Sequence, residues 1–144
     1  MQTPSIPLRR YLLDVTTAAA VLDIDSKKVF KLLENGSIEW AFDIRSKHAG
    51  RTCHRIFALS LLDYVEGKQG SYDFDAIFKL LLPGQAEHTV IRRVASALNC
   101  KPDFVGILLD DGSLKRVDKP RRQPKEAWQI WRRSVYDFLK SRRL

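Results

Sequence analysis

The sequence predicts an α+β fold, mainly helical with small β-hairpins, built from two tandem copies of one unit. Residues of the first half recur 76 positions later: Ala19, Leu22, Val29, Leu32, Leu33, Gly36 and Ser37 match Ala95, Leu98, Val105, Leu108, Leu109, Gly112 and Ser113. Ser60 and Asp63 recur 74 positions later as Ser134 and Asp137. In each copy, helical hydrophobic spacing ends at a glycine. A repeat of this length indicates two copies of a small fold.

The repeat sets the expected domain boundaries. We expect a first module over 11–68, a connecting helix and linker over 69–86, and a second module with a basic terminal helix over 87–144. Residues 1–10 predict an arm, disordered by default or lying along DNA. Each module is near the lower size limit for independent folding, so packing between the modules would stabilise both.

The first copy predicts two helices, a hairpin and a third helix. Asp14 can cap a helix over 15–22, and Asp25 or Ser26 can cap a second helix that runs to about Glu34. Alternating apolar residues over 38–44 predict a half-buried strand, which turns at Ala49-Gly50 and returns over 53–57. A helix over 58–65 closes the unit.

The second copy predicts the same order. We expect helices over 89–98 and 102–109, a loop over 114–125 that contains two prolines, and a terminal helix over 127–140. Between the copies, residues 72–82 predict a further helix that Pro83-Gly84 ends. The amphipathic stripe of the terminal helix is expected to comprise Trp128, Trp131, Val135, Phe138 and Leu139.

The charge is strongly basic and unevenly placed. The formal net charge is +8, and residues 115–144 alone carry 11 Lys/Arg against 3 Asp/Glu. Such a balance favours a polyanionic partner. The alternative is a solubilising basic tail. The aromatic residues in the same stretch favour a folded basic surface.

A pattern of apolar residues and one glycine runs through the first copy: Leu13, Val15, Ala18, Ala19, Leu22, Ile24, Val29, Leu32, Gly36 and Ile38, followed by Arg55, Phe57 and the Ser60–Val65 helix. With this pattern, residues 12–67 resemble the excisionase or MerR-type winged helix-turn-helix domain, and residues 90–141 resemble it more loosely. The resemblance implies binding of double-stranded DNA, with the second helix in the major groove. The wing tip over 46–51 is longer than is usual in excisionases. No long coiled coil follows, so a MerR-type dimer with a small-molecule effector is not expected.

The candidate DNA contacts fall into three groups. On the second helix of the first copy they are Ser26, Lys27, Lys28 and Lys31, and on the wing they are Arg45, Lys47, Arg51 and Arg55. The corresponding helix of the second copy has one basic residue and ends in two aspartates, so we expect this copy to hold the DNA backbone. Its candidates are Arg92, Arg93, Lys101, Lys115, Arg116, Lys119, Arg121, Arg122, Lys125, Arg132 and Arg133. The alternative in every case is a solvated basic face.

The sequence predicts neither catalysis nor a cofactor. His48, Cys53 and His54 lack a local fourth ligand for zinc, so no metal site is expected. No phosphate-binding glycine loop or nucleophile elbow occurs. Two cysteines without a disulfide framework fit a reducing cytosol, and no segment predicts a membrane partner.

Three functional hypotheses follow. The first is a recombination directionality factor or small transcriptional regulator of a mobile element, which binds duplex DNA alone or self-associates along it. The second is an adaptor subunit of a transposition or conjugation complex, in which the second copy binds a protein such as a recombinase or transposase. The third is a protein-binding module whose basic charge is incidental.

Overall fold

The computed structural model describes residues 10–68, 70, 72–117, 124 and 127–144. The predicted arm over 1–10 lies, apart from Arg10, outside the described residues. The described part contains these helices and strands: β1 (Leu12–Leu13), α1 (Val15–Leu22), α2 (Ser26–Glu34), β2 (Ala41–Asp43), β3 (His54–Phe57), α3 (Ala58–Glu66), α4 (Phe74–Leu81), β4 (His88–Val90), α5 (Ile91–Leu98), α6 (Pro102–Asp110), β5 (Gln129–Trp131) and α7 (Arg132–Ser141). The structure is therefore α+β, with helices and small antiparallel sheets, as predicted.

The helices of the first half (residues 10–68) begin and end at the residues that the sequence indicated. The Asp14 carboxylate accepts a hydrogen bond from the Thr17 N–H at 2.7 Å, and the Asp25 carboxylate accepts one from the Lys28 N–H at 2.9 Å. Gly36 has a φ of 78°, a left-handed conformation that glycine adopts without strain. The predictions for α1, α2 and α3 are confirmed.

The sheet of the first half has one strand more than predicted. Its order is β1-β3-β2, with Leu12 opposite Phe57 and Phe42 opposite Arg55. The two-residue strand β1 was missed because it is too short for alternation to be visible. The predicted turn at Ala49-Gly50 is also wrong, since the Ala49 N–H donates to the Ser46 carbonyl at 3.2 Å and the turn lies over 46–49.

Strand β2 is buried on both faces, although alternation predicted one exposed face. Phe42 packs into the larger hydrophobic core, while Ala41 packs into the smaller core beneath α1 and α2. Asp43 is only 9% exposed because the chain end covers it: the Asp43 N–H donates to the Arg142 carbonyl, and the Leu144 N–H donates to the Ala41 carbonyl, both at 2.9 Å.

The second half (residues 87–144) corrects two predictions. Thr89 and Val90 belong to β4 and not to a helix, because they pair with β5, Thr89 opposite Ile130. The terminal helix begins at Arg132 and not at Ala127, since Gln129–Trp131 is extended and Ile130 is fully buried. Trp128 and Trp131 therefore lie outside the helix, and the buried stripe of α7 is Val135, Phe138 and Leu139.

The expected loop over 114–125 is described only in part. Arg116 forms an isolated antiparallel bridge with Ile130, and the Val117 N–H donates to the Gln129 carbonyl at 2.8 Å. Residues 115–117 thus run along β5 as β2 runs along β3. Residues 118–123 and 125 lie outside the described part.

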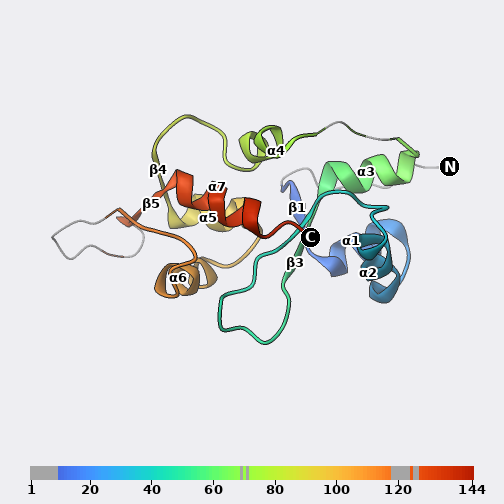
Figure 1. The fold of residues 1–144 in the computed structure, drawn as a ribbon, viewed down its shortest axis with the longest axis horizontal. Coiled ribbons are helices and arrows are strands. Elements are labelled where there is room, and N and C mark those ends of the chain that lie inside the picture. The colour runs from blue at the N-terminus through green and yellow to red at the C-terminus, as the bar shows by residue number, and fades with distance from the viewer. Residues whose placement is uncertain (1–9, 69, 71, 118–123, 125–126) are drawn as a thin grey trace.

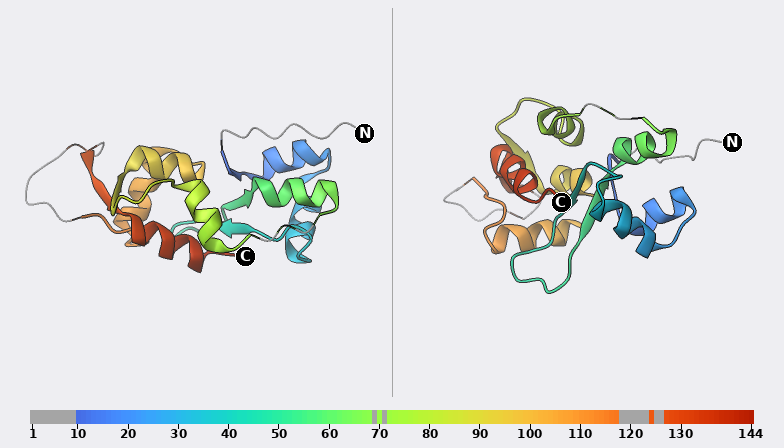
Figure 2. Two further views of the ribbon diagram at one scale, coloured as in Figure 1. Left: turned by 90° about the horizontal axis from the view of Figure 1, so that it is seen from above. Right: turned by 45° about the vertical axis from the view of Figure 1, so that its right-hand side comes forward.

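The larger core is shared by the two halves. It contains Phe42 and Phe57 from the first sheet, Ile77 from α4, and residues of α5, α6 and α7. The segment 69–86, expected to connect the copies, thus contributes Phe74, Ile77, Phe78 and Leu81 to this core. Figures 1 and 2 show α1–α3 at one end of the long axis and α5–α7 at the other, with α4 and the first sheet between them.

Candidate nucleic-acid interface

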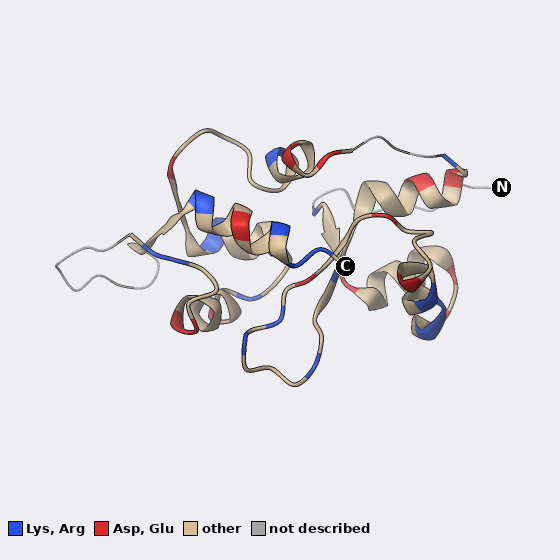
Figure 3. Ribbon diagram, in the orientation of Figure 1, with Lys and Arg blue, Asp and Glu red and all other residues tan. Residues whose placement is uncertain are grey.

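Helix α2 presents a polar and basic face to solvent. Val29 is fully buried and fixes the side of the helix that faces the core, while the predicted residues Ser26, Lys27, Lys28 and Lys31 are all exposed. Figure 3 shows lysine and arginine gathered on α2, on the loop between β2 and β3 (residues 44–53, the wing loop), and on α7 with the chain end. The first two are the helix expected to enter the major groove and the predicted wing.

An aromatic residue on α2 was missed by the sequence analysis. Phe30 is 38% exposed, and its ring meets the edge of His54 with centroids 5.1 Å apart. Burial lowers the pKa of His54, and the Asp43 charge offsets this only in part, so the imidazole is neutral at neutral pH. The sequence did contain a signal for this exposure: Phe30 shares one helical face with the charged residues Lys27, Lys31 and Glu34.

The four predicted wing residues have different environments. Lys47 and Arg51 are exposed. The Arg45 guanidinium pairs with the Asp43 carboxylate, with Nε 3.3 Å from Oδ2. Arg55 faces the second half and donates to backbone carbonyls: its Nε is 3.0 Å from the Leu98 oxygen, and its Nη2 is 2.9 Å from the Asn99 oxygen. Arg55 therefore joins the halves.

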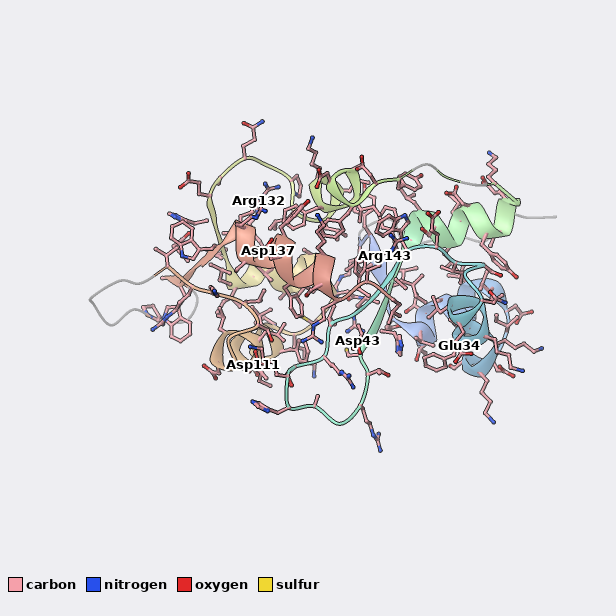
Figure 4. All side chains as sticks on the ribbon, in the orientation of Figure 1. Glu34, Asp43, Asp111, Arg132, Asp137 and Arg143 are labelled. Carbon is pink, nitrogen blue, oxygen red and sulfur yellow. The ribbon has the colours of Figure 1, made fainter. Side chains whose placement is uncertain are left out.

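The wing loop is also tied to the second half. The carboxylate of Asp111, which is labelled in Figure 4 at the end of α6, accepts hydrogen bonds from the Lys47 N–H at 2.8 Å and from the Ser113 N–H at 2.7 Å. Burial raises the pKa of Asp111, but these hydrogen bonds and the Lys47 charge outweigh it, so the pKa lies below its usual value. The carboxylate is ionised at neutral pH and fixes Lys47.

The predicted cations of the second half do not form one surface. Arg92 and Arg93 are exposed on α5 near Arg10, and Lys101 is exposed before α6. Arg132 donates to the Leu82 carbonyl and lies over the Phe78 ring at 5.0 Å, so it is partly buried. Lys115, Arg116 and Arg133 are exposed, with Arg116 over the Trp128 ring at 4.2 Å. Lys119, Arg121, Arg122 and Lys125 lie outside the described residues.

Helix α6 has a different surface from α2. Ile107 is 50% exposed, and Asp103 and Asp110 are exposed beside it at helical spacing. Gly106 is buried on this helix. A surface that combines carboxylates with an exposed isoleucine does not suit a phosphate backbone.

The described residues contain no group of three or more His, Cys, Asp or Glu that could hold a metal ion. Burial raises the pKa of Cys100 to about 11, so its thiol is protonated and poorly nucleophilic at neutral pH. Within the same part of the chain, no helix is long and apolar enough to cross a bilayer.

Comparisons of the whole chain with protein-family models, curated proteins and solved structures find no match to any of them.

Proposed function

We propose that the protein binds double-stranded DNA through α2 and the wing loop. In this proposal the chain consists of two tandem winged helix-turn-helix modules of the excisionase or MerR type, with α2 in the major groove. Lys47 and Arg51 contact the backbone beside α2. The biological role is that of a recombination directionality factor or a small transcriptional regulator of a mobile element.

The exposed face of α2 is the observation that carries the proposal. It combines Ser26 with three lysines on a helix held by an Asp25 cap and a buried Val29. A helix of this kind fits the major groove, where lysine reaches guanine acceptors or grips phosphate. The order is strand-helix-helix-strand-strand-helix in the first half and strand-helix-helix-strand-helix in the second, and this similarity supports the tandem arrangement. The shared core supports a fixed placement of one module relative to the other.

The second half is proposed to hold the DNA backbone with its exposed cations, chiefly Arg92, Arg93 and Lys101. Such contacts add affinity and salt dependence without sequence preference. A second candidate role, that of an adaptor subunit, is favoured by α6. Its exposed Ile107 between Asp103 and Asp110 suits a protein partner better than DNA.

The test is to measure duplex binding by a Lys27→Ala/Lys31→Ala variant, with fluorescence anisotropy as the readout, across a series of salt concentrations. A Lys68→Ala/Lys79→Ala variant is the matched control, because it removes the same charge from exposed positions away from α2. We expect the α2 variant to lose about tenfold or more in affinity, since a base contact contributes roughly 1–3 kcal/mol. Equal affinities of the two variants would refute the role of α2.

A further inference from the structure

A groove of about 460 Å³ lies between the wing loop, the turn after α6, and α7. This volume is within the range of about 300–1,000 Å³ that is typical of small-ligand sites. Its lining comes from both halves: Lys47 from the wing loop, Ser113 and Lys115 from the turn, and Trp131, Arg133 and Arg142 from β5, α7 and the chain end. We call it the α7 groove.

The charge of the α7 groove suits phosphate. Four cationic side chains line it, Lys47, Lys115, Arg133 and Arg142, against one carboxylate, that of Asp137. Asp137 is already paired, since its Oδ1 is 3.2 Å from the Arg133 Nε. Among the described residues, neither Lys115 nor Arg142 forms an ion pair. The groove therefore retains unpaired positive charge for an anionic ligand.

The groove also contains an exposed aromatic surface. Trp131 lines it and is 39% exposed, although its ring meets the His88 ring edge-on with centroids 4.7 Å apart. Tryptophan beside cations is the combination that binds an unpaired base together with its phosphate. A paired duplex keeps its base faces stacked inside and would leave the indole without a partner.

The walls of the groove are held in place by backbone contacts. The Asp111 carboxylate joins the wing loop to the turn after α6, at Lys47 and Ser113. On the other side, the Ser134 hydroxyl donates to the Trp131 carbonyl at 2.8 Å and accepts from the Lys115 N–H at 3.1 Å. These contacts fix the backbone that carries Lys47, Lys115 and Trp131 before a ligand arrives, which reduces the entropy cost of binding.

We propose that the α7 groove binds single-stranded nucleic acid, with phosphates on Lys47, Lys115 and Arg142 and a base against Trp131. This site is separate from the exposed face of α2, so the inference goes beyond duplex binding. Because Lys47 belongs to the wing loop, the groove begins beside the surface proposed to hold a duplex. A strand that leaves an opened duplex could enter it directly.

The test is anisotropy of a labelled oligothymidylate of about eight nucleotides, with the full-length protein at low salt. The Trp131→Leu variant is expected to bind it about fivefold to 150-fold more weakly, since stacking on an aromatic has an effect of this size. Lys115→Ala is expected to weaken binding and to reduce the salt slope by about 0.7. Lys79→Ala, an exposed cation outside the groove, is expected to change neither.

Two further ligands complete the test: an abasic oligonucleotide separates base stacking from phosphate contacts, and duplex DNA separates the groove from the face of α2. An abasic oligonucleotide of the same length keeps the phosphates, and it should bind wild-type protein about as weakly as the Trp131→Leu variant binds oligothymidylate. Equal affinity for the two oligonucleotides, or full affinity in both Trp131→Leu and Lys115→Ala, would overturn the proposal. Duplex binding by α2 is tested separately from the groove: the Lys27→Ala/Lys31→Ala variant should lose affinity for duplex DNA and keep its affinity for oligothymidylate.

Discussion

Arg55 provides a quantitative test of how the two halves are joined. Its guanidinium donates to the Leu98 carbonyl and twice to the Asn99 carbonyl, at 3.0, 3.1 and 2.9 Å. Both carbonyls lie at the carboxyl end of α5, where a cation also interacts favourably with the helix dipole. The Arg55→Ala variant removes the donors and leaves both acceptors to find water.

The magnitude follows from the two acceptors. A hydrogen bond from a charged donor contributes about 1.5–3 kcal/mol, and the partial exposure of Arg55 favours the lower end. We therefore expect Arg55→Ala to lower the free energy of unfolding by about 2–4 kcal/mol. For a chain of this size, this is a fall in Tm of roughly 6–12 °C.

The assay is unfolding in urea and on heating, monitored by circular dichroism. Arg55→Lys should recover only part of the loss, because one ammonium cannot reproduce the planar fork of donors. Arg51→Ala, which removes an exposed wing cation, should stay within about 0.5 kcal/mol of wild type. If Arg55→Ala were as stable as Arg51→Ala, Arg55 would not join the halves.

Three other outcomes follow from the structure. Phe42→Ala empties a fully buried site in the shared core, so it should lower the free energy of unfolding in urea by about 3–5 kcal/mol. Unfolding should still occur in a single transition, and separate transitions for the two halves would contradict a shared core. Burial raises the pKa values of Asp14 and Asp111, but hydrogen bonds to the two carboxylates outweigh it and hold both pKa values below the usual range, so both groups contribute stability that is lost as pH falls below about 4. Asp111→Asn removes this contribution at one site, so Tm should fall less steeply in the variant than in wild type as the solution is acidified; equal falls would contradict the role of the Asp111 carboxylate. Burial raises the pKa of Cys100 from 9.0 to about 11, so its thiolate is about a hundredfold scarcer than that of an ordinary cysteine. Mass spectrometry after iodoacetamide treatment at pH 8 should therefore show slow alkylation at Cys100. Alkylation as fast as that of a cysteine in an unstructured peptide would count against its burial.

The helices of the first half could be predicted because their signals are local. Asp14, Asp25 and Gly36 act on backbone groups within three residues of themselves, and the structure uses each of them as expected. The strands β1, β4 and β5 could not be predicted in this way. Each has two or three residues and exists through pairing with a distant partner, as Thr89 pairs with Ile130.

The candidate site was predictable in its charges but not in their partners. The exposure of Lys27, Lys28 and Lys31 follows from helical spacing against Val29. The contact of Arg55 with Leu98 and Asn99 joins residues more than 40 positions apart, so no local pattern encodes it. Trp131 was assigned to a helix because its spacing to Val135 and Phe138 is helical, which concealed its place in the α7 groove.

The most direct test of duplex reading by the first half is hydrogen exchange of the full-length protein with and without duplex DNA. We expect slower exchange over α2, Ser26–Glu34, and over the wing loop when duplex is added, with exchange over the exposed face of α6 unchanged. Slower exchange over α6, Pro102–Asp110, with α2 unaffected would contradict it.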